Sequence, residues 1–117
     1  GESDNWGGEQ ERLNQVFGAR LRITGLRGAA GMAVEFLEYL SPSDGRGPLA
    51  DLAANDLAHW QIRVEVADAE AAARALRPAG GRWVSPGAVT LDDARLGFTR
   101  GALVRDGDGH GVLLSEP

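Results

Sequence analysis

The sequence predicts an α+β domain, and three observations support that class. Two segments, Ala19–Leu26 and Trp60–Val66, alternate apolar with polar residues, and a period of two is typical of a strand with one buried face. An alanine-rich segment from Ala69 to about Ala79 follows Asp68, a residue type that caps helix N-termini. Short apolar runs follow that helix, so residues 57–117 have the predicted order β-α-β-β-β.

The first part of the chain predicts two strands and a short helix. Gly1–Gly8 is expected to be a loop or the frayed end of a strand, and Glu9–Phe17 a short helix that Gly18 ends. Met32–Leu40 contains good helix formers, but its length of nine and the turn residues on both sides favour a strand. Ser41–Ala54 is rich in Pro, Gly and Asp and is the predicted linker.

Downstream of the helix the sequence predicts short strands and one tight turn. The strands are Arg82–Pro86, Gly97–Arg105 and Val112–Leu114, with Val89–Leu91 either a further strand or a loop. The turn is Asp106–His110, and its aspartates lack the spacing of a calcium-binding loop. Turn chemistry is therefore sufficient to explain them, and His110 is expected to be an exposed turn residue.

The composition limits the classes of function. A chain of 117 residues with 43% hydrophobic and 25% charged residues is one ordinary domain. Its net charge of -5, from 12 basic and 17 acidic residues, argues against a nucleic-acid partner. The absence of Cys excludes disulfides, thiolate metal sites and a Cys nucleophile. No apolar run approaches the ~18–20 residues of a membrane span, and no signal-peptide pattern is present, so the expected location is the cytoplasm.

The segment Asn55–Val66 carries the candidate site. Its predicted apolar face consists of Trp60, Ile62, Val64 and Val66, and its predicted polar face of His59, Gln61, Arg63 and Glu65. An imidazole, an amide and a guanidinium on one face suit the wall of a polar cavity. A solvated sheet face with one incidental histidine explains the pattern equally well. Trp60 is expected to pack in the core.

Several motifs follow one another in a specific order. A strand with His59 near its start precedes the helix Asp-Ala-Glu-Ala-Ala-Ala-Arg-Ala-Leu, then Gly-Gly-Arg-Trp-Val-Ser-Pro, and then a strand that ends Val-Arg-Asp-Gly-Asp-Gly-His. This order resembles the second βαβββ module of the vicinal oxygen chelate superfamily, which includes glyoxalase I, extradiol dioxygenases and bleomycin resistance proteins. Val34–Leu40 resembles the last strand of the first module.

The resemblance implies an α+β fold in which paired βαβββ modules form a cup-shaped mixed sheet. It divides the chain into an incomplete first module, a linker and a second module, which are residues 1–40, 41–54 and 55–117. By this resemblance the chain is expected to begin inside the first module, near its second strand, without that module's first strand and helix. Because cups of this superfamily usually close across module or subunit interfaces, a homodimer is expected.

The superfamily's metal site implies roles for individual residues. It holds a divalent metal with a His from each module's first strand and a Glu from each module's last strand. By that pattern His59 and Glu35 would bind Zn, Ni, Mn or Fe, and Leu113 stands where the second Glu is expected. A general base is an alternative role for Glu35. Gln61 and Arg63 would contact an anionic or oxygen-rich small molecule, although Arg63 could instead pair with Glu35 or Glu65.

Three classes of function stay open. The first is a metal-dependent lyase, isomerase or dioxygenase, in which the metal polarises paired oxygens of the substrate. The second is a metal-free protein that sequesters an antibiotic-like small molecule, as the bleomycin-binding relatives do. The third is a non-catalytic interaction domain.

Overall fold

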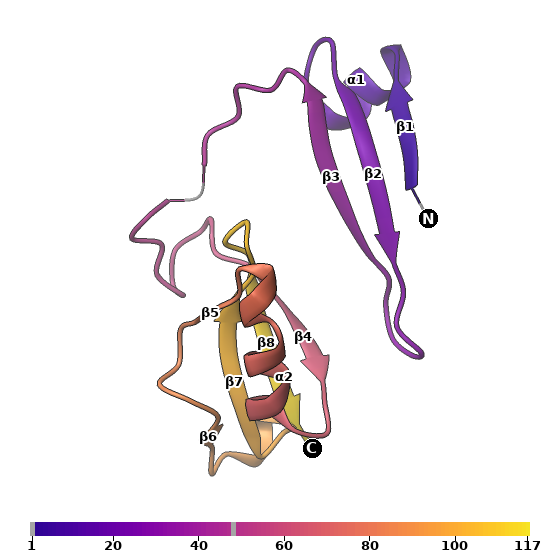
Figure 1. Ribbon diagram of the computed structural model, residues 1–117. Coiled ribbons are helices and arrows are strands. Elements are labelled where there is room, and N and C mark those ends of the chain that lie inside the picture. Colours follow the sequence, from indigo (N-terminus) through magenta and orange to yellow (C-terminus); the bar gives the residue numbers. More distant parts are fainter. Residues whose placement is uncertain (1, 48) are drawn as a thin grey trace. The chain divides into compact units, whose positions relative to one another are not determined.

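The computed structural model describes residues 2–47 and 49–117. Residues 1 and 48, which belong to the predicted N-terminal segment and the predicted linker, lie outside the described part. The chain divides into two compact units between residues 47 and 48, here called unit 1 and unit 2 (Figure 1). The predicted α+β class is confirmed, because each unit contains a sheet and at least one helix.

Unit 1 is a three-stranded antiparallel sheet in the order β1-β2-β3. Its elements are β1 (Glu2–Trp6), α1 (Gly8–Asn14), β2 (Arg20–Leu26) and β3 (Val34–Ser41). The predicted strands before and after the turn at residues 27–33 are confirmed. The N-terminal segment forms a full strand, because it pairs with β2 along its whole length.

Helix α1 is shorter than the sequence predicts. It ends at Asn14, and Gln15 adopts a left-handed conformation with φ 56° that stops the helix before Gly18. Two apolar residues of the predicted helix are largely exposed, Leu13 by 80% and Phe17 by 92%. The i, i+3, i+4 spacing of Leu13, Val16 and Phe17 therefore does not form a buried helix face.

Unit 2 has the predicted β-α-β-β-β order with one further two-residue strand, β6, in the segment for which the sequence allows a strand or a loop. Its elements are β4 (Gln61–Glu65), α2 (Ala69–Ala75), η1 (Arg77–Ala79), β5 (Arg82–Trp83), β6 (Val89–Thr90), η2 (Ala94–Leu96), β7 (Arg100–Arg105) and β8 (Gly111–Glu116). The strand order is β4-β8-β7-β5, and β6 also pairs with β7. Strand β4 is parallel to β8, whereas β7 is antiparallel to both of its main neighbours. The last strand of the unit is therefore central in the sheet.

Helix α2 lies across one face of this sheet and forms the core of unit 2 (Figure 1). The buried core residues are Ala69, Ala73, Ala102, Val104 and Leu114. Small alanines on the helix allow close approach to the strands, and the burial of apolar surface stabilises the pair. No helix among the described residues is long and apolar enough to cross a membrane.

The start of α2 is fixed by two carboxylates. The side chain of Asp68 accepts a hydrogen bond from the backbone N–H of Ala71 at 2.9 Å, as the sequence predicts for a helix cap. The Glu116 carboxylate, at the end of β8, accepts from the N–H of Ala69 at 2.8 Å and from Arg100 at 2.7 Å. The helix is thereby tied to the last strand of the chain.

Candidate functional site

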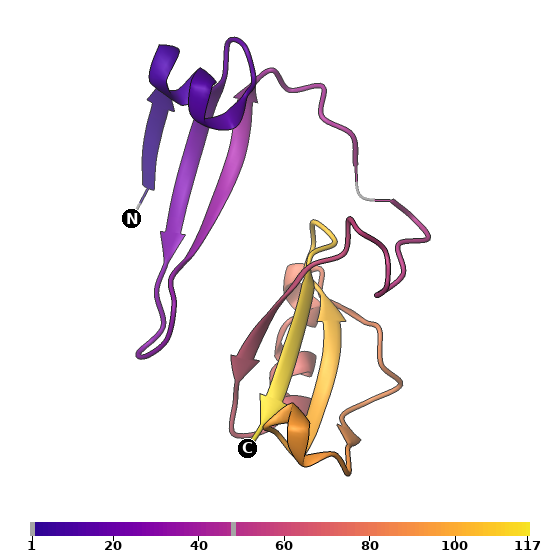
Figure 2. The ribbon, with the colours of Figure 1, turned by 180° about the vertical axis from the view of Figure 1, so that it is seen from behind.

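Gln61 and Arg63 of the predicted site lie on the face of the unit 2 sheet that points away from α2, called the open face from here on. Figure 2 shows the sheet from this side, with α2 behind it. Val104 and Leu114 pack on the α2 side, so the residues that alternate with them point to the open face. Strand register arranges these residues in rows across the sheet. The first row contains Gln61, Gly111, Arg105 and Arg82, and the second contains Arg63, Leu113 and Leu103.

Arg63 is held by neighbours on the open face. Its Nε donates to Oγ of the buried Ser115 at 2.9 Å. Its two terminal nitrogens donate to the carbonyls of Leu96 and Gly97, at 3.1 and 2.7 Å. The guanidinium carbon lies 4.8 Å from the centroid of the Phe98 ring, within the range of a cation–π contact. Arg63 therefore fastens the segment after η2 to the sheet and, among the described residues, forms no ion pair with a carboxylate.

His59 lies just before β4 rather than on it. The sequence places it on the strand, but the strand begins at Gln61. The backbone of the preceding segment closes turns in which the N–H of Asp56 donates to Ala53 at 3.1 Å and that of His59 donates to Asp56 at 3.0 Å. The alternation of strand side chains begins only after these turns, so His59 is placed by the turn and not by the sheet.

The His59 side chain is half-buried, and only one of its two ring nitrogens lies close to a hydrogen-bond partner among the described residues. Its Nε2 lies 3.4 Å from Oε1 of Gln61. Its Nδ1 is buried and has no hydrogen-bond partner among the described residues. Buried polar atoms are almost always hydrogen-bonded in native proteins, so this nitrogen is a position where a water, an ion or a ligand atom can bind.

Trp60 departs from its predicted place in the core. Its side chain is 53% exposed. Its ring lies 5.0 Å from the His110 ring, centroid to centroid, with the planes tilted by 39°. The start of β4 is thus connected to the turn between β7 and β8.

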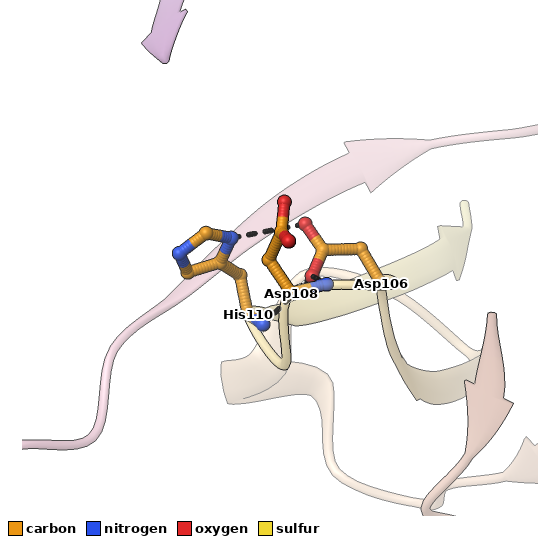
Figure 3. Close-up of side chains that lie close together, drawn as sticks. All are labelled: Asp106, Asp108 and His110. Carbon is orange, nitrogen blue, oxygen red and sulfur yellow. Dashed lines mark hydrogen bonds and ion pairs between the residues drawn. The ribbon is translucent and has the colours of Figure 1, made fainter. Parts of the chain in front are cut away.

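That turn brings together three potential ligands, Asp106, Asp108 and His110 (Figure 3). One ligand atom of each lies within 4.8 Å of the others. The Asp106 carboxylate already accepts hydrogen bonds from the N–H groups of Asp108 and His110, at 3.0 and 2.8 Å. Its second oxygen lies 3.0 Å from Nδ1 of His110. The predicted tight turn is therefore confirmed, and its first carboxylate shapes it.

The same contacts determine the ionisation of Asp106. Burial raises the pKa of the Asp106 carboxyl, but the hydrogen bonds from the side chain and backbone of His110 and from the backbone of Asp108 outweigh it. The pKa of Asp106 is therefore held below its ordinary value of 3.8. The carboxylate stays ionised at neutral pH and continues to accept all of these hydrogen bonds.

Glu35 lies in unit 1, on β3, where its register partner is Gly25 of β2. Its side chain is exposed, as are Leu37 and Tyr39 on the same face of the strand. The structure fixes each unit internally, so the predicted convergence of Glu35 with His59 stays a prediction.

Among the predicted site residues, the structure brings His59 next to Gln61 and places Arg63 in the adjoining row of the open face. Sequence reasoning missed Arg82 and Arg105, which lie side by side on the same face. Only the register between β5 and β7 places these two residues together. That register cannot be derived from the sequence of either strand alone.

The fold is that of a glyoxalase-like α+β domain. The structure is similar to the crystal structure of a glyoxalase family protein from Bacillus cereus, with a TM-score of 0.76, 19% sequence identity and coverage of 99% of this chain and 74% of that chain. At this identity the similarity establishes the fold. No protein-family model matches the sequence, and no curated protein does.

Proposed function

We propose that this chain is a glyoxalase-like domain that binds a small molecule against the open face of unit 2, beside His59 and Gln61. The observation that carries the proposal is the buried Nδ1 of His59, which has no hydrogen-bond partner among the described residues. Leaving a buried polar atom unsatisfied costs on the order of 1–3 kcal/mol. A bound metal ion or ligand group at this nitrogen would remove that cost.

In the enzyme version of the proposal, His59 and Glu35 hold a divalent metal. Imidazole and carboxylate ligands suit zinc, nickel, manganese or iron, and such a metal would polarise oxygen atoms of a substrate for lyase, isomerase or dioxygenase chemistry. The orphaned nitrogen of His59 fits a metal ligand. Glu35 would be either the second ligand or a general base, and Gln61 would orient the ligand with its amide.

A metal titration of the full chain tests this version. We expect uptake of Zn²⁺, Ni²⁺, Mn²⁺ or Fe²⁺ by calorimetry at neutral pH, and its loss in His59→Ala and Glu35→Gln. His110→Ala is the matched control, because it removes the other histidine and leaves His59 in place. Loss of uptake in His110→Ala alone would move the metal to the β7–β8 turn. No uptake by any protein would exclude the metal version.

The second candidate is metal-free binding of an antibiotic-like molecule. The observation that favours it is Leu113, which lies in the second row of the open face and offers no metal ligand. Nitrogen-15 NMR with a library of small aromatic and aliphatic compounds would test it. We expect shifts of amide signals at Gln61, Leu103 and Leu113, with no added metal. If no compound shifts these signals, a non-catalytic interaction domain becomes the better proposal.

The proposal also covers how the chain is divided into modules and how many copies associate. Residues 1–40 would act as the incomplete first module and residues 55–117 as the second, with residues 41–54 between them. The division of the structure between residues 47 and 48 falls inside that middle segment. We propose a homodimer, and analytical ultracentrifugation at micromolar concentration should give twice the mass of the chain. A monomer would contradict it.

A further inference from the structure

We infer that the small molecule bound on the open face carries an anionic group, a carboxylate or a phosphate, joined to an apolar body. The inference rests on the proposed function and deepens it by assigning the class of ligand. The residues that carry it are Arg82, Arg105 and Arg63 of the open face, together with Leu103 and Leu113 between them.

The strongest observation is a pair of like charges on neighbouring strands. Arg82 of β5 and Arg105 of β7 are direct register partners. Residues paired in this way have Cα atoms about 5 Å apart, and like charges in such positions destabilise a sheet. An anion bound between the two guanidinium groups would turn this repulsion into attraction.

Other arginines of the chain are neutralised by carboxylates. Five arginines form ion pairs with Asp or Glu, and these are Arg20, Arg22, Arg74, Arg95 and Arg100. Within the described part of the chain the other seven form none, and three of these, Arg63, Arg82 and Arg105, lie on the open face. The chain as a whole has a net charge of -5. The adjacent Arg82 and Arg105 are therefore a local excess of positive charge in an acidic protein, with Arg63 one row away on the same face.

Two carboxylates lie close to these arginines in the sequence or the sheet, and neither forms an ion pair with them within the described residues. Asp106 follows Arg105 directly, but its oxygens accept from His110 and the backbone of the turn. Glu65 shares the open face, in the third row, opposite Ser115. It forms no ion pair with Arg63. The positive groups of the first row are thus left for a ligand.

Two of these guanidinium groups are held in place by neutral acceptors. Arg105 donates to the carbonyls of Gly109 and Leu52, at 2.7 and 3.2 Å. Arg63 is held in a similar way by Ser115 and by two carbonyls. Carbonyl partners fix the position of the group and leave its charge unneutralised. An anionic ligand would therefore meet preorganised donors and would lose less binding free energy to side-chain ordering.

The middle of the open face supplies the apolar contact. Leu103 and Leu113 are direct register partners and half-buried, and they lie one row from Arg105. In the first row, Gly111 separates Gln61 from Arg105 and leaves that position without a side chain. A Cβ there would lie 3.1 Å from the Cβ of Gln61, so the close approach of the strands favours glycine. Leu103 and Leu113 therefore form an apolar patch beside charged groups, and small-molecule sites combine apolar contact with a few polar groups in this way.

The test compares acids with a neutral compound of the same shape. Benzoate and phenyl phosphate would each be titrated into the full nitrogen-15-labelled chain, with benzamide as the neutral partner. We expect at least one acid to bind about tenfold more tightly than benzamide, because charge-assisted bonds to arginine are stronger than neutral ones. The two acids show whether the carboxylate or the phosphate is preferred. The preference should weaken when sodium chloride is raised from about 50 to about 500 mM.

The variants localise the effect. Arg82→Gln should abolish the preference for the acid. The Arg82 side chain is exposed and forms no ion pair within the described residues, so the fold should tolerate the change. Arg74→Gln is the matched control, because it removes the same charge from α2 on the opposite face. An equal loss in both variants would overturn the inference, since a long-range charge effect would then explain it. Equal binding of benzamide and the acids would overturn it too, while small-molecule binding would stand. No binding by these probes or by any library compound would overturn both proposals.

Discussion

The two α-helices among the described residues have the same length, but only one of them buries side chains. Helices α1 of unit 1 and α2 of unit 2 are each seven residues long. Helix α2 reads Ala-Glu-Ala-Ala-Ala-Arg-Ala and buries Ala69 and Ala73 against the sheet, whereas α1 reads Gly-Glu-Gln-Glu-Arg-Leu-Asn and buries no residue. The difference shows that a short helix builds a core only when small apolar residues occupy the face toward the sheet.

The two sheets also differ, because the last strand of unit 2 has a neighbour on each side and the last strand of unit 1 has one neighbour within residues 2–47. The last strand of unit 2, β8, is flanked by β4 and β7, whereas the last strand of unit 1, β3, pairs with β2 alone within residues 2–47. Side chains on a central strand are positioned from both sides, and those on an edge strand from one. The open face of unit 2 is thus the better-ordered platform for a binding site, and Glu35 stands on the less constrained strand.

Truncation of the unit 2 core should give the largest effect. Leu114 is 4% exposed and belongs to the cluster under α2. We expect Leu114→Ala to lower the free energy of unfolding by about 2–5 kcal/mol, because it removes buried methyl groups and leaves a cavity. Urea unfolding followed by circular dichroism measures this. A loss below about 1 kcal/mol would show that unit 2 does not depend on this core.

Removal of the α2 cap should give the next largest effect. Asp68→Ala deletes the acceptor for the Ala71 N–H, and α1 has no equivalent side-chain cap to lose. We expect a loss of about 1 kcal/mol in the free energy of unfolding. Asp68→Ser, which keeps a capping oxygen, is the control and should retain most of the stability. Equal losses in the two variants would assign the effect to the charge of Asp68 and not to the cap.

The features that the sequence predicts well are those with local signals. The Asp68 cap, the alanine-rich helix after it and the turn at 106–110 each have their determinants within a few residues, and the structure confirms them. The β-α-β-β-β order of unit 2 follows from these pieces. The boundaries are less well predicted, as the turns before Gln61 show, because the backbone hydrogen bonds that close them leave no apolar pattern.

The features that the sequence does not predict depend on strand register. Arg82 and Arg105 are 23 positions apart in the chain and adjacent in the sheet. Register is set by pairing across strands and by turn geometry, so it is absent from each strand's own pattern. The Trp60 contact with His110 has the same origin, because parallel pairing of β4 with β8 brings the two together. Convergence of Glu35 with His59 stays a prediction.

Acid should destabilise the β7–β8 turn but not the β2–β3 turn. The expected loss of stability is smaller than for Leu114→Ala or Asp68→Ala. The pKa of Asp106 is below its ordinary value of 3.8 in the folded chain, so its stabilising contribution is complete above that value. It is lost as the pH falls through the lower folded pKa. We expect a loss of no more than about 1 kcal/mol, because solvent screens a partly exposed carboxylate. Amide exchange by NMR should accelerate in the β7–β8 turn below about pH 4 and not in Arg27–Ala33, which contains no carboxylate.

Asp106→Asn provides the control for the acid effect. The amide oxygen still accepts from the N–H groups of Asp108 and His110 but does not titrate. Amide exchange in the turn of this variant should therefore no longer change with acid. If the variant and the parent lose protection at the same pH, another group controls the turn.

Truncation of the unit 1 helix should have the smallest effect. Leu13 is 80% exposed on α1, so Leu13→Ala removes almost no buried surface. We expect a change within about 0.5 kcal/mol in the free energy of unfolding, which is the usual range for surface substitutions. Ala72→Ser on α2 is the comparison, because Ala72 packs against the core cluster and a hydroxyl there enters an apolar contact. If Leu13→Ala destabilises the chain by more than about 1 kcal/mol, α1 covers apolar surface in solution and the contrast between the two helices fails.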